Sequence, residues 1–337
     1  MRKIRVGQIG CAHDHAGCVI QSLRKLTDVF EVIGYAVPEG EAARSYDHPE
    51  TLYDGLRRMT PEELLDAPGL DAVIVETSEP NLTRYALAAA RRGLPVHMDK
   101  PGGLDYAEFR ELVRTAKEKR SILHLGYMYR YNPEVQKLLR EIKEGKLGEI
   151  YSVEAQMNCA HQSQKRAWLG KFPGGMLFFL GCHLIDLIYR IQGEPEEVIP
   201  LSCATGIDGV TAEDFGMAVM RYKNGVSFAK SCAAEQGGFL RRQLVVCGSR
   251  GTVQLLPFEI YSPDGGVATC VREIFDNPGW GYDGERRQTA FPDRYDGMMR
   301  AFAEYVTGEK ENPYSYDSEL AVYRLLLRAC GVKIREE

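Results

Sequence analysis

The first 125 residues alternate short apolar runs with segments of helical spacing, and this alternation limits the folds open to the chain. The apolar runs cover residues 4–9, 30–37, 70–76, 95–98 and 122–125, and the helical segments cover residues 15–26, 61–65, 82–92 and 106–119. Strands that alternate with helices at this spacing predict a doubly wound parallel sheet with right-handed crossovers. A ligand crevice is expected at the carboxyl ends of its strands.

The pattern changes after residue 126. Residues 133–143 read as a helix, and the longer β-forming stretches that follow cover residues 149–159, 214–222, 226–233, 241–247 and 252–256. Asn224-Gly225 between two of them is a hairpin signal. Helices are also expected near 176–191 and 293–307. These features predict an α+β domain whose antiparallel, open-faced sheet is covered by helices on one face.

The expected organisation is therefore an N-terminal Rossmann domain over residues 1–125 and an α+β domain over residues 126–312. The last segment, 313–337, contains an apolar helix that we expect to pack back on the first domain. Length supports this division, because 337 residues suffice for two domains, each with its own core.

Charge and cysteine usage exclude several functions. The net charge is −5 and no basic block occurs, which argues against nucleic-acid binding. The nine cysteines are spread singly, without a Cys-x-x-Cys pair, as is typical of reduced cytosolic proteins. The N-terminus lacks the apolar region of a signal peptide, and the most apolar stretch, 176–191, is too short to span a bilayer. We expect a cytoplasmic protein that binds neither nucleic acid nor membrane.

The loop after the first strand is the candidate nucleotide site. It contains Gly10, Cys11, Ala12, His13 and Asp14, followed by His15. A Rossmann fingerprint G-x-G-x-x-G brings backbone amides and a helix N-terminus to the pyrophosphate. Only the first glycine of the three is present here, so the position after the first strand carries the interpretation, and a structural turn is the alternative.

The end of the second strand bears on the choice of cofactor. An acid is expected there to bond the ribose hydroxyls, and the sequence has Pro38 followed by Glu39. Glu39 and Glu41 would repel a 2′-phosphate, and no arginine stands directly beside them in the sequence. This favours NAD over NADP, although Glu39 could equally be a solvated loop residue.

Two residues could move a proton. Lys100 follows a strand in Asp99-Lys100-Pro101, where burial and a nearby positive cofactor would lower its pKa. His183 lies on an apolar helix, with Asp186 on the same face. A solvated turn for Lys100 and a hydrogen-bonded core residue for His183 are the alternatives.

No metal site is expected. His13 and His15 could bind a metal ion in principle, but no cluster of carboxylates accompanies them in the sequence. Cys182 and His183 are adjacent on a helix and therefore point apart.

Taken in order, these segments resemble the Gfo/Idh/MocA oxidoreductases. The resemblance covers essentially the whole chain and rests on Gly10, the Asp99-Lys100-Pro101 segment, Arg130-Tyr-Asn-Pro133, Gly145-Lys-Leu-Gly148, Gly174-Gly175 and Gly181-Cys-His183-Leu-Ile-Asp186. It implies hydride transfer between a nicotinamide and a hydroxyl-bearing carbon of a sugar, cyclitol or sugar derivative.

The resemblance also implies roles for single residues. Lys100 and His183 become the catalytic pair, and Thr77, Ser78 and Asp99 join Lys100 on the cofactor side. The substrate candidates are Tyr129, Arg130, Arg166, Trp168 and Asp186. One departure stands out: where many members have an aspartate four residues before the histidine, this chain has Phe179. Phe179 can neither accept a proton nor bond a hydroxyl.

Two other functions stay open at this point. One is redox-neutral, glycosidase-like chemistry with a tightly bound NAD, and the other is a non-catalytic nucleotide sensor on the same fold. The expected partners are a sugar or polyol substrate and further copies of this chain. We expect a homodimer or homotetramer through the C-terminal sheet, because exposed apolar sheet surface is rarely left bare.

Overall fold

The computed structural model describes residues 2–44, 48–261, 266–275 and 279–334. They form two compact units. The first unit contains the chain up to Met128 together with Tyr295–Tyr323, and the second contains Tyr129–Arg294 and the chain from Arg324 onward. The chain therefore passes from one unit to the other three times, after Met128, Arg294 and Tyr323.

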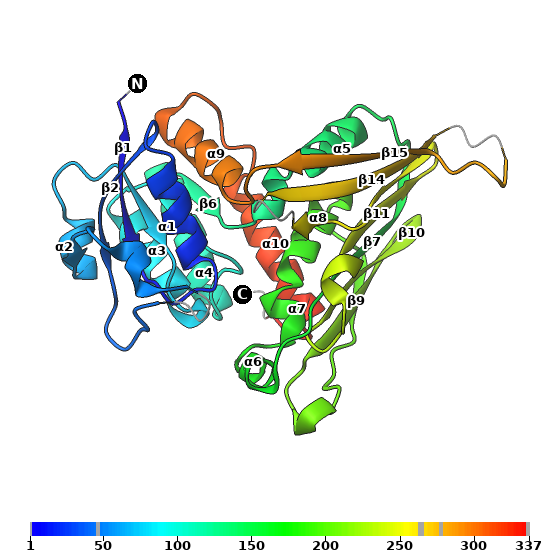
Figure 1. Cartoon of the computed structure of the whole chain (residues 1–337), viewed down its shortest axis with the longest axis horizontal. Coiled ribbons are helices and arrows are strands. Elements are labelled where there is room, and N and C mark those ends of the chain that lie inside the picture. Colours follow the sequence, from blue (N-terminus) through cyan, green and yellow to red (C-terminus); the bar gives the residue numbers. More distant parts are fainter. Residues whose placement is uncertain (1, 45–47, 262–265, 276–278, 335–337) are drawn as a thin grey trace. The chain divides into compact units, whose positions relative to one another are not determined.

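A parallel sheet forms the centre of the first unit (Figure 1). Its described strands are β1 (Ile4–Ile9), β2 (Phe30–Ala36), β3 (Arg58–Met59), β4 (Ala72–Val75), β5 (Val96–Met98) and β6 (Leu123–Leu125), in the order β3-β2-β1-β4-β5-β6. The order reverses between β1 and β4, which creates a switch point at the carboxyl ends of these strands. The predicted doubly wound sheet is confirmed.

Helices cover this sheet. They are α1 (Ala16–Lys25), α2 (Pro61–Leu65), α3 (Leu82–Arg91), α4 (Tyr106–Lys119) and α9 (Asp296–Thr307), with short 3₁₀ turns η1 (Glu50–Tyr53) and η2 (Glu79–Asn81). Right-handed crossovers in both directions from the switch point place α1 and α3 on opposite faces. The expected capping box of α2 is present: Thr60 accepts from the Glu63 amide, and the Glu63 carboxylate accepts from the Thr60 amide.

Helix α9 belongs to the first unit, whereas we expected residues 293–307 in the second domain. Its first turn is fixed to α1, since the Ser22 hydroxyl donates to the Asp296 carboxylate at 2.7 Å and Lys25 pairs with the same group. Buried Met299 and Phe302 then face the interior, and the Phe302 ring stacks on His124 of β6. Apolar contact with the parallel sheet therefore decides where this helix belongs.

A larger sheet forms the second unit (Figure 1). Its described strands are β7 (Ile150–Asn158), β8 (Glu197–Pro200), β9 (Phe215–Tyr222), β10 (Gly225–Cys232), β11 (Gln243–Gly248), β12 (Gly251–Leu255), β13 (Ile260–Tyr261), β14 (Val267–Phe275) and β15 (Glu285–Phe291). The order is β13-β14-β12-β11-β7-β10-β9-β8, with β15 beside β14. Neighbours are antiparallel except β7 and β10, which pair in parallel, so the sheet is mixed. The predicted hairpin joins β9 and β10.

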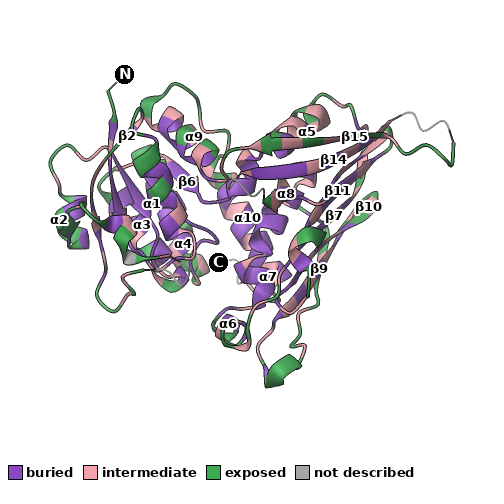
Figure 2. Cartoon of the chain, in the orientation of Figure 1, coloured by how far each residue is buried: buried purple, intermediate pink, exposed green. Residues whose placement is uncertain are grey.

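One face of this sheet carries helices, as expected. They are α5 (Pro133–Lys143), α6 (Ser163–Trp168), α7 (Met176–Phe179) and α8 (Cys182–Gln192), with 3₁₀ turns η3 (Met128–Tyr131), η4 (Leu169–Lys171), η5 (Ile207–Gly209) and η6 (Gly238–Arg241). Helices α7 and α8 pack on the central strands and are largely buried (Figure 2). They replace the single helix predicted over 176–191, which breaks at Leu180 and Gly181.

Helix α10 (Tyr316–Ala329) contributes to both units, because Tyr323 belongs to the first and Arg324 to the second. Within the first unit, the buried Tyr323 hydroxyl donates to the Gly103 carbonyl at 3.0 Å, and its ring contacts Phe109. The first half of the C-terminal helix thus packs on the first unit, whereas the chain from Arg324 onward belongs to the second. No described helix combines the length and apolar character that crossing a membrane requires. All nine cysteines are free thiols.

Candidate functional site at the carboxyl ends of the parallel strands

The predicted nucleotide loop lies between β2 and β4. The Gly10 amide donates to the Ala36 carbonyl at 2.8 Å, and the His13 amide donates to the Glu76 carbonyl at 3.2 Å. Gly10 has a φ of +91°, and a Cβ added there would lie 2.4 Å from the Thr77 nitrogen. Only glycine permits this approach. The loop therefore leads from β1 into α1 as a Rossmann loop does.

The side chains of this loop point in different directions. Cys11 and His13 are buried, and burial raises the pKa of the Cys11 thiol to about 12. Ala12 and Asp14 are partly exposed. A ligand at this loop would therefore meet backbone amides, Ala12 and Asp14 rather than the side chains of Cys11 and His13.

The end of β2 opens on a cavity of about 580 Å³. It is lined by Val37, Glu39, Arg58, Met59, Thr60, Pro61, Glu62, Glu63, Arg84 and Tyr85. Arg58 arrives because β3 pairs with β2, and Arg84 comes from α3. No arginine is adjacent to Glu39 in the sequence, but sheet pairing brings in residues that are distant in the chain. Pro38 is buried and Glu39 is exposed.

Glu41 was expected to face the 2′-position of the cofactor, but it binds the loop after β4. Its carboxylate accepts hydrogen bonds from the Ser78 amide at 2.8 Å, from the Ser78 hydroxyl and from the Asn81 amide group. Glu41 thus fixes the loop after β4, which carries the predicted cofactor residues Thr77 and Ser78. Thr77 is fully buried, and Ser78 is partly exposed.

Asp99 and Lys100 stand at the carboxyl end of β5 and are both buried. The His15 Nδ1 donates to the two carboxylate oxygens of Asp99 at 3.2 and 3.1 Å, and the Lys100 amide donates to Asp99 at 2.6 Å. The His13 Nε2 donates to the Lys100 carbonyl at 3.2 Å. The structure thus connects the nucleotide loop to Lys100 through hydrogen bonds.

A second carboxylate lies beside this group. Glu76, at the end of β4, is fully buried, and neither of its oxygens has a hydrogen-bond partner among the described residues. Burial raises the pKa of Glu76 well above its usual range, and the neighbouring Asp99 raises it further. For Asp99, burial opposes ionisation, but His13, His15 and Lys100 outweigh it and hold its pKa well below the usual range. Burial lowers the pKa of His13 to about 3, so this imidazole is neutral at pH 7.

The fold brings the Asp99 carboxylate to His13 and His15, although the sequence shows no cluster of carboxylates near them. Ligand atoms of His13, His15 and Asp99 lie within 4.8 Å of one another. The strands β4 and β5 deliver the acids to the loop after β1, a proximity that spacing along the chain does not reveal.

His183 lies in the second unit, on α8, and is buried. The Tyr129 ring meets it edge-on at a centroid distance of 4.9 Å. The Tyr129 hydroxyl donates to Glu259 at 2.6 Å and accepts from Arg242 and Arg294 at 3.2 and 2.6 Å. Sequence reasoning missed these last three residues, because each is an isolated charge in a different segment.

The buried charges of the second unit are paired with one another. Arg130 binds Asp186 through two hydrogen bonds of 2.9 and 2.7 Å, and Arg190 binds Asp186 at 3.1 Å. Burial opposes the ionisation of Asp186, but these two arginines lower its pKa. Asp186 therefore holds α8 in place. The substrate role of Arg130 and Asp186 stays a prediction, and their burial favours a structural one.

Arg166 and Trp168 come from α6. The buried Arg166 donates to Asp214 at 3.1 Å and to the Ile207 carbonyl at 3.0 Å. Trp168 is partly exposed and packs edge-on against Phe179 at 5.2 Å, with the Lys165 ammonium 3.8 Å from the Trp168 ring centroid. Among the predicted substrate residues, Trp168 is the one whose side chain is partly exposed.

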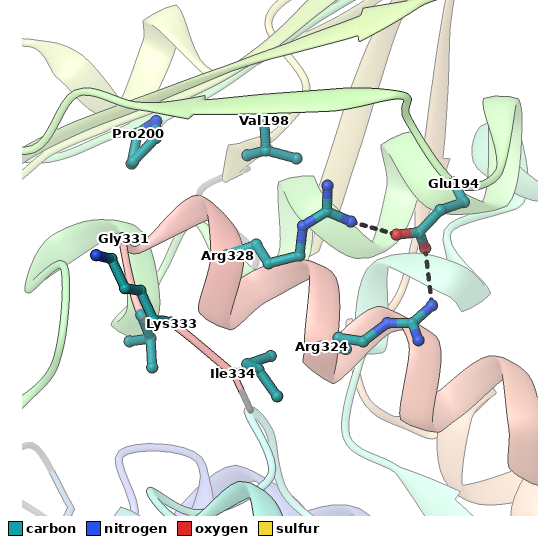
Figure 3. A pocket seen from close by; sticks show the side chains of 9 residues that line it. Glu194, Val198, Pro200, Arg324, Arg328, Gly331, Lys333 and Ile334 are labelled. Carbon is teal, nitrogen blue, oxygen red and sulfur yellow. Dashed lines mark hydrogen bonds and ion pairs between the residues drawn. The ribbon is translucent and has the colours of Figure 1, made fainter. Parts of the chain in front are cut away.

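A cavity of about 780 Å³ in the second unit contains none of the predicted residues. It lies between β8 and the end of α10, and Glu194 pairs there with Arg324 and Arg328 (Figure 3). Its two arginines share one carboxylate, and Lys333 also lines the cavity.

The comparisons identify the family. Residues 4–127 match the oxidoreductase family with an NAD-binding Rossmann fold, and residues 135–254 match the GFO/IDH/MocA C-terminal domain. The chain belongs to the Gfo/Idh/MocA oxidoreductases. The order of segments in the sequence had indicated this family, and the two matches confirm it.

Characterised Gfo/Idh/MocA relatives are distant. The chain is 23% identical over 218 residues to the trans-1,2-dihydrobenzene-1,2-diol dehydrogenase of Xenopus tropicalis, a match that spans 64% of each protein. It is 23% identical to the myo-inositol 2-dehydrogenase of Thermotoga maritima over 66% of this chain and 64% of that enzyme. The matches thus cover less than two thirds of these relatives.

Solved structures share the fold along almost the whole chain. An oxidoreductase from Thermotoga maritima superimposes with a TM-score of 0.75 at 18% identity, covering 98% of this chain and 96% of that one. A 3-ketoreductase from Actinomadura kijaniata, in complex with TDP-benzene and NADP, superimposes with a TM-score of 0.73 at 20% identity, covering 97% and 96%. The fold of these structures thus extends over almost the whole of this chain.

Phe179 provides a test of the second unit. It is buried against Trp168 and Phe172, so we expect Phe179→Ala to lower the free energy of unfolding by about 3–5 kcal/mol. Phe179→Asp should also lower it, because a carboxylate replaces a ring packed on aromatic neighbours and has the Lys165 ammonium, 4.7 Å from the ring centroid, to offset its burial in part. Urea unfolding measures both, with the partly exposed Phe239→Ala as the control. An unchanged midpoint for Phe179→Asp would show that the ring is not a core element.

Proposed function

We propose that this oxidoreductase transfers a hydride between a nicotinamide cofactor and a hydroxyl-bearing carbon of a sugar, cyclitol or related diol. The observation that carries the proposal is Lys100, buried at the carboxyl end of β5 and joined through Asp99 and His13 to the nucleotide loop. In doubly wound sheets ligands bind at this edge. The names of the two dehydrogenase relatives, which denote a diol and an inositol, support the substrate class.

The chain's own part in the reaction is to place the carbon and to move one proton. The nicotinamide supplies the hydride chemistry when bound. Oxidation of a hydroxyl needs a base within about 3 Å as the hydride leaves. We assign this role to Lys100 and His183. Lys100 lies beside the nucleotide loop, and His183 lies on the buried helix α8 beside Tyr129.

Redox-neutral chemistry with a retained NAD is a second candidate. Phe179 stands where many family members have an aspartate, and its ring is enclosed by other aromatic side chains. It cannot take part in proton transfer. The net stoichiometry separates the two functions, because free NADH accumulates in the first and does not in the second.

Replacing the two proton carriers tests the proposal. Lys100→Met and His183→Gln should each lower kcat by about 10²–10⁴, the usual contribution of a positioned acid or base. Dinucleotide affinity, measured by fluorescence titration, should stay within a few fold. The double variant should lose less than the product of the two effects, since residues that act together are not additive.

His161→Gln is the matched control for the histidine, because His161 is partly exposed and lies outside the proposed machinery. Near-full activity of His183→Gln on the true substrate would make His183 a core residue. Full activity of Lys100→Met would show that Lys100 does not move the proton and would contradict the proposed function.

Cofactor choice depends on opposing charges at the end of β2. We propose that NAD(H) is preferred, since Glu39 would repel a 2′-phosphate, while Arg58 and Arg84 in the same cavity act in the other direction. Glu39→Gln should therefore tighten NADP(H) binding several fold and leave NAD(H) binding nearly unchanged. Arg58→Gln should weaken NADP(H) binding and leave NAD(H) binding nearly unchanged. Tighter binding of NADP(H) than of NAD(H) by the native chain would contradict the preference.

We also propose self-association into a homodimer or homotetramer through the uncovered sheet face of the second unit. Phe228 of β10 pairs with Val219 of β9 on this face, both are partly exposed, and Val226 is 51% exposed. An interface would remove these groups from water. Phe228→Lys should shift the sedimentation coefficient to that of the monomer, whereas Ile207→Lys should not. A native chain that is monomeric at micromolar concentration would rule this out.

A further inference from the structure

The buried polar cluster of the first unit holds more ligand groups than a Rossmann loop requires. It joins His13 and His15 from the loop after β1, Glu76 from the end of β4 and Asp99 from the end of β5. All are buried except His15, whose side chain is 15% exposed. Two imidazoles and two carboxylates are a donor set typical of first-row transition metals.

The distances between the donor atoms of His13, His15 and Asp99 fit one ion, and Glu76 lies beside them. The Asp99 Oδ2 lies 3.4 Å from the His13 Nδ1 and 3.1 Å from the His15 Nδ1, and the Glu76 Oε2 lies 3.8 Å from the His13 Nδ1. A tetrahedral ion about 2.1 Å from each donor keeps the donors about 3.4 Å apart. The ligand atoms of His13, His15 and Asp99 thus lie within 4.8 Å of one another before any ion enters, and Glu76 must move toward them to complete the set.

Glu76 gives an independent reason for an ion. A fully buried carboxylate whose oxygens accept no hydrogen bond from the described residues is costly, and a second carboxylate beside it adds repulsion. The buried His97 Nε2 lies 3.6 Å from the Glu76 Oε1 and the His13 Nδ1 lies 3.8 Å from the Glu76 Oε2, both beyond hydrogen-bond distance. A divalent ion would compensate both acids at once, whereas the alternative is a proton held on Glu76.

We propose that the first unit binds one divalent transition-metal ion of the zinc type through His13, His15 and Asp99, with Glu76 as the fourth ligand. The ion replaces the proton on the His15 Nδ1 that is now shared with Asp99, and it takes the His13 Nδ1 from the His15 amide, which donates to it at 3.2 Å. Binding therefore needs small shifts of side chains and releases protons.

The full chain, treated with a chelator and then dialysed, is titrated with Zn²⁺ by calorimetry and with Co²⁺ by visible absorption. We expect one ion per chain, a Co²⁺ spectrum with the intense bands of low coordination, and a rise in Tm that grows with Zn²⁺ concentration. Absence of Co²⁺ bands and of a Tm shift in the native chain would overturn the proposal and leave a proton on Glu76.

Variants locate the ion. His15→Gln, Asp99→Asn and the near-isosteric Glu76→Gln should each weaken Zn²⁺ binding at least about 10-fold. His161→Gln in the second unit, which removes one imidazole elsewhere, should leave it unchanged. Equal binding by all four variants would place the ion at another site and overturn the assignment. If Asp99→Asn does not fold, judged by circular dichroism, the other two ligand variants decide.

Discussion

The first unit depends on one buried carboxylate. Asp99 ends β5 and receives hydrogen bonds from the Lys100 amide and from the His15 ring, so it ties the loop after β1 to the end of a strand two places away in the sheet. A buried charge is tolerated only when it is paired. The direction of Lys100, the path of the nucleotide loop and the state of Glu76 all follow from how that charge is satisfied.

In the second unit, arginines neutralise the buried carboxylates. Asp186, Asp214 and Glu259 are each buried and each meets guanidinium groups. Such pairs contribute little net stability but are costly to break on one side, so they fix a single arrangement of the elements they join. The two units therefore differ: the second neutralises its buried acids with permanent cations, and the first surrounds its acids with groups that can exchange protons.

Most of the fold could be predicted from the sequence, because its helices, strands and turns follow from the local spacing of apolar residues and from turn and cap residues. Helix α5 has the bounds read from its Pro start, and the turn between β9 and β10 follows from Asn224-Gly225. Strands β14 and β15 were missed; β15 begins with three charged residues and lies mostly exposed, so it lacks the apolar pattern of a strand. The site was predicted as single residues but not as groups. That Arg58 meets Glu39, and that Asp99 meets His15, depends on strand order, which local patterns do not contain.

The three passages of the chain between the units also decide when each can be completed. The first unit needs α9 and the start of α10, whose Phe302 and Tyr323 are fully buried, yet these residues follow Tyr129–Arg294 in the chain. During translation the N-terminal 128 residues must therefore wait, with part of their apolar surface uncovered, until the whole of Tyr129–Arg294 has emerged. Neither unit can therefore be completed before the other has begun, because each contains a segment that follows part of the other in the chain.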